Sequence, residues 1–336
     1  MMPVLSIMIP TFNRARYLRE CLDSVLPQTI RVPVEVVVID NASPDETPEV
    51  VKAYTGRYAA LRSFRNDRNL GYAGNQAKCI EYAKGQYIAI LCDDDIYLPG
   101  AVAGILAVAQ RREYAFIALN YSSFTRSPDR PRAPHVGPLA DREFGRAYDV
   151  MKHPSVGHYS GFVFNAVVAK QALAGIVKRR ALADFEVYRG ILAELSVRAL
   201  IPSSLPSFYI GQPWVGARQP LVVDYDALQH LCLDYYQWAF GLHAEGVLSD
   251  GDLAHVRHAV LNWLPKALIR FAGYFDVVRL RQVRAQLDGW FKEEPAYNRR
   301  SVPLFGWLER PWVRWGLRLV FNSYRVAKAF WWNARR

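Results

Sequence analysis

The sequence has few cysteines and no long uninterrupted apolar run. Its four cysteines, Cys21, Cys79, Cys92 and Cys232, are scattered and form no CxxC pair. This spacing argues against a disulfide framework or a zinc site and favours a reducing compartment. Polar residues interrupt every apolar stretch before the ~18 residues that a membrane span needs. Because the chain has 336 residues, 51% of them hydrophobic, we expect one large globular domain or two ordinary ones.

Net charge is absent from most of the chain. The formal charge of +11 comes from residues 257–336, which hold 16 Lys and Arg against 5 Asp and Glu, so that the first 256 residues are neutral. A neutral front part is not expected to bind nucleic acid, and we predict no nucleic-acid partner. Any acidic partner is therefore expected to bind the C-terminal region.

Short apolar runs alternate with helical patterns in the first 120 residues. The runs that predict strands lie at 5–10, 34–39, 61–65, 87–92 and 116–120. Helical spacing is found between them, at 15–25, 48–54, 74–83 and 99–111. This alternation predicts an α/β domain with a mainly parallel sheet that helices cover on both faces. Such sheets bind ligands at the carboxyl ends of their strands.

The later sequence changes in character. Residues 126–159 are rich in proline and polar side chains and are expected to form a long functional loop. A strand at 161–168, a helix over about 184–195 and extended segments near 197–211 are expected to follow. The sequence is helical and aromatic from about 221 onward. We therefore predict two parts, an α/β domain at 1–215 and a helical, basic, aromatic-rich region at 216–336.

Three adjacent carboxylates, Asp93, Asp94 and Asp95, follow the predicted strand at 87–92. Adjacent like charges at the edge of a core are costly unless a cation balances them. One interpretation is a capped turn, since Asp is favoured at turns and helix N-caps. Another is a site for Mg²⁺ or Mn²⁺, which one or two carboxylates and substrate phosphates can hold. A phosphatase-type nucleophile loop is disfavoured. Such a loop normally follows the first strand of its fold, whereas this cluster follows about the fourth predicted strand.

Three segments resemble the family 2 glycosyltransferases of the GT-A fold. They are SIMIPTFNRARYLRECLDSVLPQT at 6–29, VEVVVIDNASPDET at 34–47 and NDRNLGYAGNQAKCIEYAKGQYIAILCDDDIYLPG at 66–100. The resemblance implies a Rossmann-like sheet and transfer of a sugar from a nucleoside-diphosphate sugar to a glycan acceptor. The residues that it implies in binding this donor are Pro10, Thr11, Asn13, Arg14, Asp40, Asn41, Asn69, Gly71, Asn75 and Asp93. Many relatives have Asp-Asp at positions 40 and 41, so it stays open whether Asp40 or Asn41 contacts the base.

The same resemblance implies a metal site in the carboxylate cluster. Relatives usually have an acid where this chain has Cys92. Aligned on the IYLP that follows, the motif makes Asp94 the ligand of Mn²⁺ or Mg²⁺ and Asp93 a contact of the ribose. Asp95 is then a further ligand or a supporting residue. A literal DxD pattern would instead use Asp93 and Asp95.

The resemblance also implies a general base and an acceptor site. In the inverting enzymes that this chain resembles, an Asp or Glu at a helix start deprotonates the acceptor hydroxyl. The segment ALADFEVYRGILAE at 181–194 matches that helix start, which implies Asp184 as the base and Glu186 as the fallback. A plain N-cap is the alternative role for Asp184. HYSGFVFN at 158–165 resembles a segment that borders the acceptor site in O-antigen and capsule transferases, including an abequosyltransferase-like group. It implies His158 and Ser160 in contact with the acceptor or the diphosphate.

The stretch RPWVRWGLRLVFNSYRVAKAFWWNARR at 310–336 has no acid. On a helical wheel its cations at 314, 318, 325 and 328 fall within about an 80° arc, with apolar side chains opposite. This pattern predicts an amphipathic helix on an anionic membrane surface, with docking on the α/β domain as the alternative. Together with the resemblance, it predicts a cytoplasmic protein, peripheral on the inner face of the cell membrane. Its acceptor would be polyprenyl-diphosphate-linked, in bacterial surface polysaccharide synthesis.

Two other classes of protein stay open. A nucleotidyltransferase acting on sugar phosphates would also use a metal at strand ends, but is expected to have a glycine-rich, lysine-bearing loop after the first strand. PTFNRARY at 10–17 has no glycine. A non-catalytic glycan- or lipid-binding relative would keep the fold without needing Asp184 or the metal.

Overall fold

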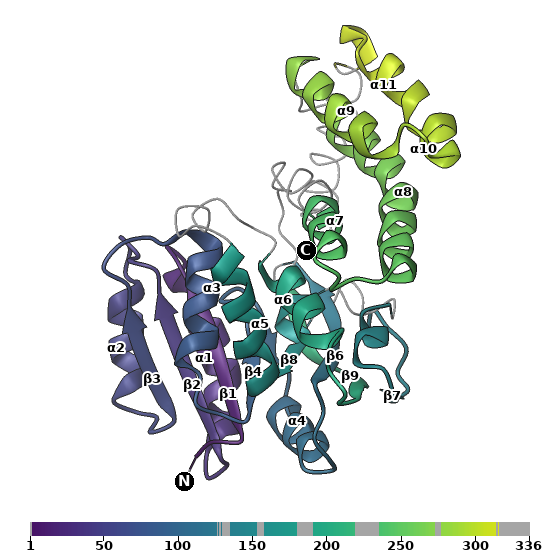
Figure 1. Ribbon diagram of the computed structural model, residues 1–336. Coiled ribbons are helices and arrows are strands. Elements are labelled where there is room, and N and C mark those ends of the chain that lie inside the picture. The colour runs from purple at the N-terminus through teal and green to yellow at the C-terminus, as the bar shows by residue number, and fades with distance from the viewer. Residues whose placement is uncertain are drawn as a thin grey trace. The chain divides into compact units, whose positions relative to one another are not determined.

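The computed structural model describes residues 2–125, 127, 129, 135–152, 158–179, 191–218, 235–272, 277–313 and 315. The chain divides into two units, Met1–Val222 and Val223–Arg336 (Figure 1). Residue 215, where the sequence suggests a boundary, lies inside strand β9 (Ser207–Arg218). The last residues of that strand therefore belong to the first unit.

The first unit is built on one mixed sheet. Its strands are β1 (Leu5–Thr11), β2 (Val34–Asp40), β3 (Leu61–Arg65), β4 (Tyr87–Ile90), β5 (Ile96–Tyr97), β6 (Phe116–Phe124), β7 (Arg142–Phe144), β8 (Phe162–Asn165) and β9. Over the described residues the order is β3-β2-β1-β4-β8-β6-β9-β5, with β7 paired to β9. Strands β3, β2, β1 and β4 are parallel, as are β6 and β9. The predicted α/β fold is confirmed, but the sheet is mixed because β8 runs antiparallel between β4 and β6.

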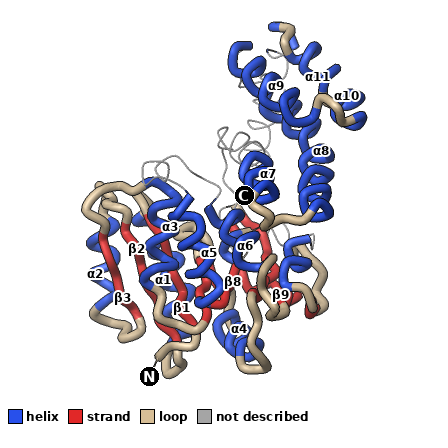
Figure 2. Tube along the Cα trace, in the orientation of Figure 1, coloured by secondary structure: helices blue, strands red, loops and turns tan. Residues whose placement is uncertain are grey.

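Helices cover both faces of this sheet. They are α1 (Ala15–Val25), α2 (Thr47–Thr55), α3 (Gly71–Tyr82), α4 (Ala101–Ala109), α5 (Ala166–Arg179) and α6 (Ile191–Leu200), with the 3-10 turns η1 (Leu26–Thr29), η2 (Ala147–Lys152) and η3 (Tyr159–Gly161). Helix α1 packs on α2 and α4 packs on η1, whereas α3, α5 and α6 pack on one another. Figure 1 shows this second group in front of the sheet, and Figure 2 shows the strands between the helices.

The early strands form where their apolar runs predict them, because both faces of the sheet are covered. All seven residues of β2 are buried, including its last residue, Asp40. In α1 the buried side chains recur at helical spacing, at Leu18, Cys21, Leu22 and Val25. The polar ends of these strands are thereby held at one edge of a rigid core.

Two predictions beyond residue 160 are wrong. The strand expected at 161–168 ends at Asn165. Its Oδ1 accepts hydrogen bonds from the backbone N of Val167 (3.0 Å) and Val168 (3.4 Å), and this N-cap starts helix α5. An apolar run of this length fits a strand or a buried helix equally well. The extended segment expected near 197–211 is helical through Leu200 and becomes a strand only at Ser207.

The second unit is helical in the part that the structure describes. Its helices are α7 (Tyr235–Ala244), α8 (Asp250–Ala272), α9 (Val277–Phe291), α10 (Pro295–Arg300) and α11 (Val302–Leu308). Helix α8 packs against α7, α10 and α11. None of the described helices combines the length and the apolar character that a membrane crossing requires. The predicted amphipathic tail falls almost wholly outside the described residues.

Gly161 stands at the close junction between η3 and β8. A Cβ added there would lie 2.7 Å from the carbonyl oxygen of Leu119 in β6. We expect Gly161→Ala to lower the free energy of unfolding by about 1–3 kcal/mol through overpacking, measured by urea denaturation. Gly56→Ala is the matched control, because its added Cβ would meet nothing within 4 Å. Equal unfolding midpoints for the two variants would contradict the prediction.

Candidate functional site

Several of the predicted site residues lie at the carboxyl ends of neighbouring strands. Thr11 ends β1, Asp40 ends β2, and the three carboxylates at 93–95 lie in the turn between β4 and β5. Because β1 pairs in parallel with both β2 and β4, these three ends meet at one edge of the sheet. Pro10 lies inside β1, opposite Ile39 of β2. This edge is the usual binding edge of an α/β sheet.

Asp93 is buried against the loop that follows β1. Thr11 Oγ1 donates a hydrogen bond of 2.7 Å to Asp93 Oδ2, and Arg14 Nη1 lies 3.2 Å from Oδ1. Burial raises the pKa of Asp93, the charge of Arg14 opposes this rise, and the resulting pKa is about 7. One guanidinium therefore does not fully compensate this carboxylate, and a further cation would stabilise its charged form.

Asp95 is the most completely hydrogen-bonded of the three. Its Oδ2 accepts hydrogen bonds from Ser160 Oγ and from His158 Nε2, each at 2.6 Å, and its Oδ1 accepts one from the backbone N of Arg218 at 2.7 Å. Ser160 Oγ in turn accepts a hydrogen bond from the backbone N of Cys92. Burial lowers the pKa of His158, but the Asp95 carboxylate outweighs it, so that the pKa is raised and the imidazolium is favoured.

Asp94 is the carboxylate that stays partly open. Its side chain is 28% exposed, against 7% for Asp93 and 2% for Asp95. Asp94 Oδ2 lies 2.9 Å from Arg14 Nη1. Burial raises the pKa of Asp94, the charge of Asp95 raises it further, and Arg14 lowers it, with a net rise. Asp94 is therefore the carboxylate of the three that a ligand from solvent can reach most easily.

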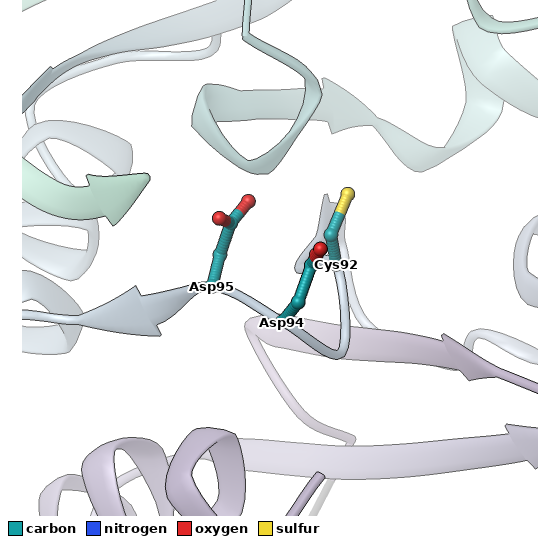
Figure 3. Close-up of side chains that lie close together, drawn as sticks. All are labelled: Cys92, Asp94 and Asp95. Carbon is teal, nitrogen blue, oxygen red and sulfur yellow. The ribbon is translucent and has the colours of Figure 1, made fainter. Parts of the chain in front are cut away.

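The turn from β4 to β5 contains a set of side chains that could hold a metal ion. Cys92, Asp94 and Asp95 offer ligand atoms within 4.8 Å of one another, and Figure 3 shows their side chains on the same side of the turn. Burial, together with the charge of Asp95, raises the pKa of the Cys92 thiol well above its usual range. A neutral thiol is a poor ligand for Mg²⁺ or Mn²⁺. The fitting donors are Asp94 and the remaining lone pair of Asp95 Oδ1, with other positions left for substrate oxygens.

A second polar cluster organises the loop at the carboxyl end of β2. Asn41 Nδ2 donates hydrogen bonds to Asn69 Oδ1 (2.8 Å) and to the carbonyl oxygen of Gly71 (3.1 Å). Asn41 Oδ1 accepts hydrogen bonds from Asn66 Nδ2 and from the backbone N of Leu70, both at 2.9 Å. The Asn41 amide thus holds loop 66–71 against β2. Asn66 is a member of this network that the sequence alone did not single out.

The remaining predicted donor residues join this cluster to the loop after β1. Asp40 accepts a 2.9 Å hydrogen bond from the backbone N of Ser43 and forms an ion pair with Arg65. Ser43 Oγ accepts a hydrogen bond from the backbone N of Asn13, whose φ of 55° is left-handed, a conformation that Asn tolerates. Asn75 Nδ2 donates to the backbone of β2. The structure therefore brings the predicted residues of β1, β2 and α3 together.

Arg218, at the end of β9, is a site residue that the sequence analysis missed. Its Nε donates a hydrogen bond of 3.0 Å to the carbonyl oxygen of Asp94, and its guanidinium forms an ion pair with Glu20 of α1. The guanidinium also lies over the rings of Tyr17 and Phe124, at 5.0 and 4.6 Å. The sequence did contain a hint of this role, because Arg218 ends the extended run SFYIGQPWVGAR. The boundary predicted at 215 placed Arg218 in the C-terminal region instead of the α/β domain.

The predicted general base lies outside the described residues. Asp184 and its fallback Glu186 fall within 180–190. Helix α6 begins at Ile191, directly after that segment, and packs on α3 and α5.

Comparison with known proteins places this geometry in a family. Residues 6–170 match the sequence profile of Glycosyl transferase family 2. The chain is 35% identical over 98 residues to an uncharacterized glycosyltransferase of Methanocaldococcus jannaschii, covering 29% of this chain and 34% of that protein. It is 38% identical over 100 residues to the chondroitin synthase of Pasteurella multocida, covering 30% of this chain and 10% of that protein. The matches thus span about a third or less of these relatives.

Solved structures share the fold at low sequence identity. The S. aureus protein TarS (1–349) in complex with UDP gives a TM-score of 0.60 at 16% identity, covering 96% of this chain and 91% of that one. A Pyrobaculum calidifontis mannosyltransferase in complex with GDP-Man and Mn²⁺ gives 0.54 at 17% identity, covering 92% and 86%. The parallel β3-β2-β1-β4 half-sheet, the carboxylates after β4 and the family match all agree. Residues 6–170 of this chain are therefore a family 2 glycosyltransferase domain, and the first unit has the GT-A fold.

Proposed function

We propose that this protein is a metal-dependent, inverting glycosyltransferase that moves a sugar from a nucleoside-diphosphate sugar to a glycan acceptor. The observation that carries this proposal is that three adjacent carboxylates in the turn after β4 have three different environments. Asp93 and Asp95 are buried and hydrogen-bonded, whereas Asp94 is partly open. Proteins of similar fold have been crystallised with UDP-GlcNAc, or with GDP-Man and Mn²⁺, which supports a donor of this kind.

Each carboxylate has a separate proposed role. Asp94, with Oδ1 of Asp95, would hold Mn²⁺ or Mg²⁺. When bound, this cation supplies a Lewis acid for the charge that develops on the departing diphosphate. Asp93 would contact the ribose from the floor of the site. Ser160 and His158 fix the Asp95 carboxylate through two hydrogen bonds of 2.6 Å, and His158, at 23% exposure, would contact the acceptor or the diphosphate.

The base and the nucleotide loop complete the proposed site. Asp184 would remove the proton from the acceptor hydroxyl as that oxygen attacks the anomeric carbon. The Asn41-centred loop, with Asn69 and Gly71, would border the nucleotide. Its hydrogen bonds are already formed within the described chain, so the loop is preorganised for the base and ribose.

The acceptor is proposed to be lipid-linked, at an anionic membrane surface. Two tryptophans at the start of the C-terminal tail, Trp312 and Trp315, are 63% and 66% exposed. Exposed Trp beside Arg is typical of a helix that lies in a membrane interface. A polyprenyl-diphosphate acceptor would place the reaction at the inner face of the cell membrane, in bacterial surface polysaccharide synthesis.

Loss of the open carboxylate should abolish turnover. We expect Asp94→Ala to lower Mn²⁺-dependent hydrolysis of the preferred nucleotide sugar by about 100-fold or more, because the other two carboxylates of the cluster, Asp93 and Asp95, are buried and already hydrogen-bonded. Glu49→Ala removes an exposed carboxylate on α2 and is the matched control. Nucleotide binding by the wild-type chain without any donor turnover would contradict the enzymatic proposal.

Thermal shifts with UDP, GDP, dTDP and CDP should identify the nucleotide. At a concentration of 100 Kd, a ligand that binds only the folded chain stabilises it by about 2.7 kcal/mol. We expect one diphosphate, with Mn²⁺, to raise Tm by about 5–10 °C. Asp94→Ala should lose the Mn²⁺-dependent part of this shift. Absence of a shift with all four nucleotides would count against a nucleotide-sugar donor.

Vesicle flotation tests the membrane proposal. The full chain should float with vesicles that contain anionic lipid, and a chain ending at residue 309 should not. Arg314→Gln with Arg318→Gln should weaken flotation, whereas Arg299→Gln with Arg300→Gln, on the exposed face of α10, should leave it unchanged. Equal flotation of the full and shortened chains would refute the interfacial helix.

A further inference from the structure

Arg14 bridges two of the three carboxylates. It stands in the loop between β1 and α1, and its Nη1 lies 3.2 Å from Asp93 Oδ1 and 2.9 Å from Asp94 Oδ2. The arginine side chain is 47% exposed, so the cluster does not enclose it. A guanidinium in this position neutralises charge on the same Asp94 that is proposed to bind the metal.

The other cations around the cluster have different partners. The imidazole of His158 contacts Asp95, and the guanidinium of Arg218 pairs with Glu20. Among the described residues, Arg14 is therefore the basic side chain paired with Asp94. Its charge partly offsets the repulsion between neighbouring carboxylates that an unliganded site would otherwise carry.

A divalent cation bound to Asp94 Oδ2 would compete with the guanidinium of Arg14 for that oxygen. Mg²⁺ binds carboxylate oxygens at about 2.0–2.1 Å. A guanidinium nitrogen 2.9 Å from the same carboxylate oxygen would then lie next to a charge of the same sign. The like charges repel, and the arginine has a flexible, half-exposed stem that allows it to move away.

We infer that Arg14 is an exchangeable counter-ion, which occupies Asp94 in the metal-free chain and moves to the donor diphosphate once a divalent cation takes that carboxylate. The inference rests on the proposed function and adds a role for a residue of this chain. Arginine suits both positions, because its planar fork binds carboxylate and phosphate oxygens with similar geometry. Arg14 thus opposes binding of the metal alone and favours binding of the diphosphate to the metal-loaded site.

This exchange couples the two ligands thermodynamically. The metal releases Arg14 for the diphosphate, and the diphosphate draws Arg14 away from the metal position, so each ligand raises the affinity for the other. Without Arg14, metal binding should become easier and diphosphate binding harder. A residue that only supported the fold would weaken both.

The test measures Mn²⁺ binding directly, by electron paramagnetic resonance of free Mn²⁺, without nucleotide and at low ionic strength. We expect Arg14→Gln to bind Mn²⁺ about two- to tenfold more tightly than the wild-type chain. With Mn²⁺ saturating, the same variant should bind the preferred nucleoside diphosphate about tenfold more weakly. Arg16→Gln makes the same change of charge at an exposed position two residues away, and both of its affinities should match the wild type.

The outcomes separate this inference from the proposed function. If the wild-type chain binds Mn²⁺ and Arg14→Gln binds it equally or more weakly, the exchange is wrong while the metal site stands. A wild-type chain that binds no Mn²⁺ would overturn both. Near-ultraviolet circular dichroism of Arg14→Gln should match the wild type. If Arg16→Gln also binds Mn²⁺ more tightly than the wild type, the tighter binding of Arg14→Gln would be explained by net charge alone. The exchange would then be wrong.

Discussion

The candidate site depends on how the negative charges of three carboxylates, at the end of a buried strand, are compensated. Each would be costly in this position without a partner, and each is compensated differently. Asp93 has a hydroxyl and a shared guanidinium, Asp95 has three donors, and Asp94 has the other contact of the same guanidinium. Identical side chains therefore differ in exposure. These differences, rather than the triplet itself, give the cluster one partly open carboxylate above a buried floor.

The compensating groups come from distant parts of the sequence, and this explains the arrangement of the sheet. Ser160 and His158 reach Asp95 because η3 precedes β8, which enters antiparallel next to β4. The backbone N of Arg218 reaches the same carboxylate because β9 continues to its last residue alongside β6 and pairs with β5. Insertion of one antiparallel strand into a parallel sheet thus brings the second half of the domain to the cluster.

Sequence reasoning was accurate where a local pattern decides the structure and weaker where distant contacts decide it. The strands at 5–11 and 34–40 follow from apolar runs covered on both faces. Helix α5 was missed because the hydrogen bonds from Asn165 that start it cannot be read from apolar content. The site network of Thr11 and Asp93 formed at the predicted edge, but Arg218 was missed, because its contact with the cluster spans 123 positions along the chain. No local sequence pattern predicts a contact between residues so far apart in the chain.

The thiol at position 92 limits the negative charge of the carboxylate cluster. Cys92 Sγ lies within 4.8 Å of the ligand atoms of Asp94 and Asp95. A fourth carboxylate there would add a negative charge beside Asp95, which already raises the pKa of the Cys92 thiol. Because the thiol stays neutral, the one guanidinium of Arg14 offsets much of the charge on the two carboxylates that it contacts. A neutral residue at 92 therefore leaves Arg14 as a counter-ion for a cluster in which two carboxylates share one guanidinium.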